Sequence, residues 1–217
     1  MIVRELALAV WVSLKTSGLA AVIASALAVP AALFLAGREF RGKKLVLVIN
    51  QTWMAAPTVV IGLLFYGLLS RNGPLGGLGL LYTQTAMTIG QIVLILPLIV
   101  GFSYTALRQV DRRARPTALT LGANRRQAGW IVLREARVPL LVAVLAGFAR
   151  AISEVGIAMM LGGNIRYATR NITTSIALET AKGEFRNGVV LGILLLVLTL
   201  GINVLVQPGL RGRDGES

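Results

Sequence analysis

Five long apolar stretches are the feature of this 217-residue sequence that most constrains its fold. Each holds the ~20 residues that a helix needs to cross a bilayer. Three of them contain no charged residue at all. The sequence therefore predicts an all-α, polytopic membrane protein, built as one domain over residues 1–217 with about five transmembrane helices. The predicted spans are 6–36, 45–69, 84–107, 138–162 and 188–206.

A sixth span is the alternative count. A short helix is expected at Thr173–Ala181, and it is too polar to cross the bilayer by the same criterion. The first stretch is longer than a bilayer requires, so we expect it to be tilted, kinked near Pro30, or interfacial at its start. Pro57 and Pro97 also fall inside predicted spans, where proline kinks a helix and frees a carbonyl. Gln91 is expected to hydrogen-bond between helices, and the spacing of Gly188 and Gly192 suits close helix contact.

Composition narrows the class further. Hydrophobic residues make up 55% of the chain and charged residues 14%, against roughly 45–50% and 25% in soluble domains. This pattern excludes a disordered chain and a nucleic-acid-binding globule, despite the net charge of +13. The absence of cysteine and histidine excludes thiol nucleophiles, imidazole chemistry and Cys/His zinc sites. No catalytic, metal-binding or nucleic-acid-binding role is predicted, so the protein is not expected to be an enzyme.

The basic residues predict an orientation. Fourteen of the 22 Lys and Arg residues fall on one side of the five spans, six fall on the other, and Lys15 and Arg150 lie within spans. Because basic loops stay in the cytoplasm, the N-terminus is expected outside and the C-terminus inside. The location is then the cell membrane, in contact with lipid. An odd number of spans also suggests that a second copy is needed to enclose a pathway.

The basic loop at 108–137 is expected to fold rather than to remain a solvated tail. Asp111 can cap a helix that begins after it, and Pro116 suits a first helical turn. The small and apolar segment Ala118–Ala123 follows, and Asn124 interrupts it before a second helix around Trp130. Such a helix has a shape that fits a groove on another protein. The alternative is an amphipathic loop lying on anionic lipid.

This loop resembles the cytoplasmic coupling loop of ABC-importer permeases. The segment concerned reads T-A-L-T-L-G-A-N-R-R-Q-A-G-W-I-V-L, with Gly122 at the family's glycine and Ala118 at its last alanine. It departs from the family where Pro116-Thr117 replaces Glu-Ala and where Glu135 replaces a proline. The resemblance implies that contact with an ATPase is made by Ala118, Leu119, Leu121, Gly122 and Ala123.

A second segment, Arg150–Ile165, reads R-A-I-S-E-V-G-I-A-M-M-L-G-G-N-I. It resembles the fourth-span signature of permeases for tetrahedral oxyanions, and its Val155-Gly156 form with doubled glycine is closer to the tungstate type than to the sulfate type. The resemblance implies a type I permease fold, a homodimer, two ABC ATPase subunits that carry ATP and Mg²⁺, and an external oxyanion-binding protein. No cofactor is expected on this chain. The predicted function is tungstate import; molybdate or sulfate import and a small channel or scaffold without an ATPase are the alternatives.

Ionisable groups at membrane depth are functional candidates because they are costly there. Arg150 and Glu154 are spaced to form an i,i+4 pair, which either packs two subunits together or lines an anion path or gate. Lys15 lies at a similar depth, and we expect it to reach Glu154 unless it extends to the membrane surface. Gly163 and Asn164 complete the predicted pathway or gate residues.

Overall fold

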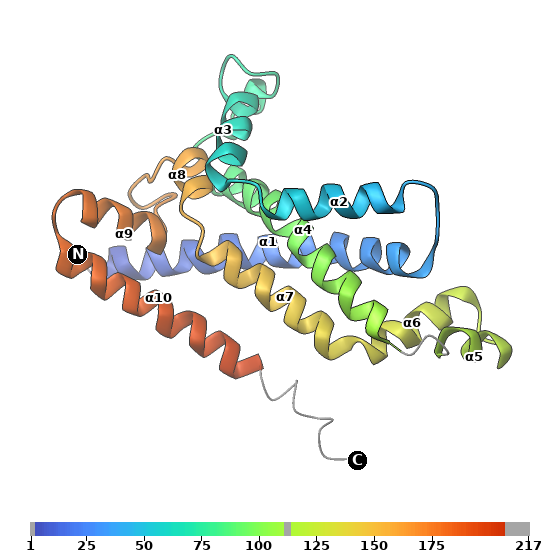
Figure 1. The fold of residues 1–217 in the computed structure, drawn as a ribbon. Coiled ribbons are helices and arrows are strands. Elements are labelled where there is room, and N and C mark those ends of the chain that lie inside the picture. The colour runs from blue at the N-terminus through green and yellow to red at the C-terminus, as the bar shows by residue number, and fades with distance from the viewer. Residues whose placement is uncertain (1–2, 111–113, 207–217) are drawn as a thin grey trace.

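The computed structural model describes residues 3–110 and 114–206, and every regular element in these ranges is helical. In the described part of the chain, ten α-helices and one short 3₁₀ turn at Gly76–Leu78 follow one another (Figure 1). The α-helices are α1 (Val3–Gly37), α2 (Lys43–Met54), α3 (Thr58–Leu69), α4 (Gln84–Gln109), α5 (Ala114–Thr120), α6 (Arg125–Glu135), α7 (Arg137–Ile152), α8 (Gly156–Gly162), α9 (Ile172–Ala181) and α10 (Phe185–Val206).

Within the described residues, three helices are individually long and apolar enough to cross a membrane, namely α1, α4 and α10. The spans predicted as continuous at 45–69 and 138–162 are instead broken. The α2–α3 pair bends by 97° and the α7–α8 pair by 58°, so the count reaches five only if each bent pair is one span. The segment at Thr173–Ala181 forms α9, as the sequence indicates.

Local chemistry accounts for both breaks. Pro57 stands before the first residue of α3 with extended backbone angles, and it disfavours helical angles at the residue before it. At the second break, the side chain of Glu154 accepts a hydrogen bond from the N–H of Ile157 at 3.2 Å, in the first turn of α8. Pro30 and Pro97, by contrast, lie inside α1 and α4, which continue through them.

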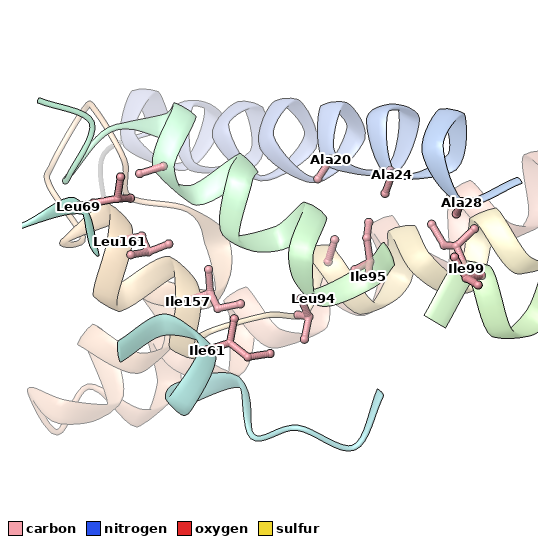
Figure 2. Packing of buried hydrophobic residues seen from close by; sticks show 14 of the residues in the cluster. Ala20, Ala24, Ala28, Ile61, Leu69, Leu94, Ile95, Ile99, Ile157 and Leu161 are labelled. Atoms are coloured by element: carbon pink, nitrogen blue, oxygen red, sulfur yellow. The ribbon is translucent and has the colours of Figure 1, made fainter. Parts of the chain in front are cut away.

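The core forms around α4, which packs against α1, α2, α7 and α8. Figure 2 shows Ala20, Ala24 and Ala28 along the side of α1 that faces α4, opposite Ile95 and Ile99. Their spacing of four residues places the alanines on one helix face. Small side chains let two membrane helices approach closely, so that dispersion contacts rather than water exclusion hold them together.

Glycines permit the other close approaches to α4. A Cβ atom on Gly147 of α7 would lie 2.6 Å from the side chain of Ile99, and one on Gly90 would lie 2.5 Å from Ile157 of α8. Since real Cβ contacts are longer, glycine at these two positions sets the distances of α7 and α8 from α4.

The two ends of the bundle differ. The short helices α5 and α6 lie at one end, and α9 lies at the other end near the N-terminus (Figure 1). The last helix, α10, runs along the outside and packs mainly against α9. Gly188 approaches Thr180 of α9, whereas Gly192 has open space beside it. The predicted small-residue face of α10 is therefore used within the chain at only one of its two glycines.

Candidate functional site

The turn after α5 explains why the segment that resembles a coupling loop has a glycine at position 122. Gly122 has a φ of +89°, a left-handed conformation that other residues adopt at a cost. The N–H of Gly122 donates to the carbonyl of Leu119 at 3.1 Å, and the N–H of Ala123 donates to the carbonyl of Ala118 at 3.0 Å. This pair of bonds is a Schellman C-cap, which satisfies the last carbonyls of the helix. The predicted cap at Asp111 lies outside the described residues.

The second helix of the loop has its own cap. Asn124 accepts from the N–H of Gln127 at 2.9 Å, and the side chain of Gln127 accepts from the N–H of Asn124 at 2.8 Å. This capping box satisfies two N–H groups at the start of α6. Ala118 and Ala128 are buried where α5 and α6 pack together. We call residues 114–135 the α5–α6 hairpin; the end of α5 and the start of α6 are both capped by bonds made within it.

The hairpin exposes large apolar side chains. Leu121 at its tip is 82% exposed and Trp130 on α6 is 68% exposed. They border an open groove of about 720 Å³. Exposed apolar surface of this kind, rimmed by polar groups, is typical of a protein–protein contact. The groove is lined by Leu121, Gly122, Ala123, Arg126, Gln127, Trp130 and Ile131.

Arg150 and Glu154 form the predicted ion pair, with 2.8 Å between Arg150 Nη1 and Glu154 Oε2. The carboxylate is 3% exposed, whereas the arginine side chain is 40% exposed. The other carboxylate oxygen, Oε1, accepts the N–H of Ile157, and the hydroxyl of Thr173 on α9 donates to the backbone carbonyl of Glu154 at 2.8 Å. The pair bridges the break between α7 and α8, so Glu154 has a structural role as well as a charge.

The predicted contact between Lys15 and Glu154 is not formed: no ion pair joins them in the part of the chain that the structure describes. Lys15 lies on the exposed side of α1. Its neighbours Ser13 and Ser17 face inward; Ser13 accepts the N–H of Ile172, and Ser17 accepts from Gln91. Residue spacing fixes depth along a helix but not which face meets which neighbour, and that is why this prediction was wrong.

Gly163 and Asn164 shape the loop after α8. Both have positive φ, +67° and +49°, and a Cβ on Gly163 would lie 2.6 Å from the ring of Tyr82. The side-chain oxygen of Asn164 accepts from Arg170 Nε at 3.2 Å. They follow the end of α8, whereas Glu154 precedes its start. The structure therefore does not place the G-N-I segment in one site with Arg150.

Two polar residues fasten helices together. Gln91 is fully buried, and its Nε2 donates to the carbonyl of Ala151 on α7 at 3.1 Å, which confirms the predicted interhelical bond. Asn50 on α2 donates to the carbonyl of Pro97 on α4 at 3.0 Å. The sequence signal for Asn50 was present, since it is an uncharged polar group inside an apolar stretch, but its partner could not be read from it.

A polar cleft of about 510 Å³ opens at the α9 end, and sequence analysis missed it. Glu5 pairs with Arg166 there, and Glu179 pairs with Lys182 at 2.9 Å. The hydrogen bond from Lys182 lowers the pKa of the Glu179 carboxyl below its usual value. Arg170 also lines the cleft. The sequence did contain a signal: six of the 22 Lys and Arg residues were assigned to this side of the membrane. They are scattered over three segments of the chain, so they did not stand out as one site.

These elements define the class: an integral membrane protein of several helical spans, which holds a capped, apolar-tipped hairpin at one end of its bundle. The chain belongs to the family described as "Binding-protein-dependent transport system inner membrane component", which matches residues 28–212.

Several relatives are similar over most of their length. A probable anion ABC transporter permease of Haloferax volcanii is 41% identical over 94% of this chain and 88% of its own. The tungstate uptake system permease of Peptoclostridium acidaminophilum is 38% identical over 91% of this chain and 86% of its own, and that of Campylobacter jejuni is 35% identical over 78% and 71%. Permeases named for molybdenum and sulfate match at 27–30% identity.

Proposed function

We propose that this chain is the permease subunit of an ABC importer for tungstate. The observation that carries the transporter class is the α5–α6 hairpin, because a membrane bundle alone has no need of a rigid hairpin with leucine and tryptophan in water. The substrate is inferred from the relatives, of which those named for tungstate are more similar than those named for molybdenum or sulfate.

The proposed assembly has two copies of the chain in the type I arrangement, with the N-terminus outside. Two ATPase subunits bind the α5–α6 hairpins through the groove beside Leu121. ATP and Mg²⁺ belong to those subunits, and no cofactor is proposed on this chain. An external oxyanion-binding protein docks at the opposite end, where the cleft near Arg170 offers cationic side chains. Docking and ATP binding together switch the pathway between inward and outward access.

Import of molybdate or sulfate is the alternative within the class. A channel or scaffold without an ATPase is the alternative outside it. The motifs favour the importer, because a channel gives no reason for the capped turn at Gly122 or for the exposed Leu121.

The test is ATP hydrolysis by the chain reconstituted with its candidate ATPase and binding protein, in the presence of tungstate, molybdate or sulfate. Tungstate is expected to stimulate hydrolysis most. A Leu121→Glu variant is expected to lose ATPase binding without loss of fold, since the side chain is exposed. The matched control is Leu78→Glu, an exposed leucine of a loop outside the hairpin. No association with the ATPase and no response to any oxyanion would overturn the proposal.

A further inference from the structure

We propose that the two helix breaks meet in one polar seam that lines the route of the anion through the membrane, an inference that rests on the proposed function. The polar seam consists of Thr58 at the start of α3 together with Arg150, Ser153 and Glu154 at the end of α7. Its members come from two breaks almost 100 residues apart in the chain.

The two breaks are in direct contact at Gly156. A Cβ atom placed there would lie 3.2 Å from Glu154 Oε1 and 3.3 Å from both Thr58 Oγ1 and Val59 Cγ2. The contact continues along α3 and α8: a Cβ on Gly62 would lie 3.0 Å from the sulfur of Met160. Figure 2 shows Ile61 and Ile157 pointing toward one another between these helices. The hydroxyl of Thr58 and the carboxylate of Glu154 therefore border the same small space.

The breaks also lie at similar depth. The first follows the 12 residues of α2, and the second follows the 16 residues of α7. At about 1.5 Å per residue, both fall roughly 18–24 Å from the helix ends nearest the α5–α6 hairpin. Interrupted backbone at such depth is tolerated only where protein covers it or water fills a cavity beside it.

The side chains of the polar seam favour water over lipid. Ser153 is exposed, and it donates to the carbonyl of Ala149 at 2.7 Å. Thr58 is half-buried, and its hydroxyl lies beside Gly156 at the edge of the break. The guanidinium of Arg150 is partly exposed, which is costly against lipid tails. A water-filled route along this face removes these costs.

The sign of the exposed charge indicates the charge of the ion that the route carries. The carboxylate of Glu154 is turned inward, with its oxygens bound by Arg150 and by the N–H of Ile157. The guanidinium is the exposed member of the pair, so the route meets a positive charge although the pair as a whole is neutral. A tetrahedral dianion is attracted to such a surface, and the buried carboxylate keeps it from binding too tightly to leave.

Because the natural chain contains no cysteine, single cysteines test the polar seam directly. The variants are Ser153→Cys and Thr58→Cys, in the full complex with ATPase and binding protein in proteoliposomes. Two variants serve as controls: Ala20→Cys, which is fully buried between helices, and Leu196→Cys, which lies on an apolar surface of α10. Each is treated with negatively and positively charged methanethiosulfonate reagents.

Both seam cysteines are expected to react at least tenfold faster than the two controls, with the anionic reagent preferred and with tungstate slowing the reaction. In an Arg150→Gln/Glu154→Gln background, which removes both charges together, the preference for the anionic reagent is expected to disappear. Labelling as slow as at Leu196→Cys, with and without ATP, would overturn the polar seam. If tungstate still stimulates ATP hydrolysis in that case, the proposed function stands; if the parent complex never responds to tungstate, the proposed function itself fails.

Discussion

Two glycines with the same backbone strain have different surroundings, and this difference can be measured. Gly163 and Gly183 have φ of +67° and +80°, but only Gly163 has a neighbour, the ring of Tyr82, where a Cβ would be. Alanine at either site costs ~1–2 kcal/mol of backbone strain. Gly163→Ala adds a steric term of about 1–3 kcal/mol. Thermal unfolding of the purified protein should therefore show the larger loss for Gly163→Ala, and equal losses would contradict the packing of this loop.

The Arg150–Glu154 pair predicts an asymmetry between its two single variants. Arg150→Met leaves a buried carboxylate without its cation, and we expect a loss of about 2–3 kcal/mol, less than the ~3–5 kcal/mol of a fully buried pair, because Arg150 is partly exposed. Glu154→Gln leaves an arginine that can still reach water, so its cost should be smaller. Unfolding of both variants and of the double variant measures the coupling. Equal losses in the two single variants would contradict this account.

Single residues were predicted best where the partner is on the same helix or where the chemistry leaves one option. Sequence spacing was enough for Arg150 with Glu154, and an uncharged polar residue inside a predicted span was enough to give Gln91 an interhelical bond. Lys15 failed because the rotation of α1 is decided by the packing of Ser13 and Ser17 against other helices. No single-helix pattern contains that information.

At the scale of helices, glycine sets distances, and replacing it should act only where helices touch. Gly147→Leu would force a side chain into Ile99, and overpacking of this kind costs about 1–3 kcal/mol or more. Gly201→Leu on α10 meets nothing within 4 Å, and it gains up to ~1 kcal/mol of helix propensity. Melting temperatures should move in opposite directions. A similar decrease in both would mean that α10 is packed more tightly than the single chain shows.

The long helices followed from apolar runs, and the two helices of the α5–α6 hairpin followed from Pro116 in a first turn and from the interruption at Asn124. Hydropathy alone did not predict the bends, because a sum over a window does not register a change of direction inside it. Pro57 marked the first break in advance. Nothing comparable marked the second, where Glu154 substitutes a side-chain oxygen for a backbone carbonyl. A glutamate in an apolar stretch predicted a functional charge, and its effect on the backbone became visible only in three dimensions.

For the whole molecule, the predicted orientation places the loop at Asn72 outside and the α5–α6 hairpin inside. Single cysteines at Asn72 and at Thr120 are exposed positions, so both should react with a membrane-impermeant reagent, the first in intact cells and the second only in inverted vesicles. Ala20→Cys should react in neither preparation. If Thr120→Cys reacts in intact cells and Asn72→Cys only in inverted vesicles, the orientation predicted from the basic residues is wrong.

Family membership could be predicted from the sequence alone because two short motifs indicate it, one in the α5–α6 hairpin and one around the break between α7 and α8. The proposed association of two copies is not settled in this way, because it depends on surfaces such as that of α10, which a single chain leaves uncovered. Crosslinking between copies through cysteines on α10 would show whether a second copy or lipid covers that surface.

The α5–α6 hairpin also bears on how strongly the chain can hold a soluble partner. Association normally costs conformational entropy, about 0.5–1.5 kcal/mol for each side chain that becomes fixed and more for a loop that must fold. Here the Schellman turn and the capping box already fix the backbone of the turn between α5 and α6 before any partner arrives. A partner therefore meets a preorganised surface, and more of the contact energy of Leu121 and Trp130 is left for affinity and for transmitting force.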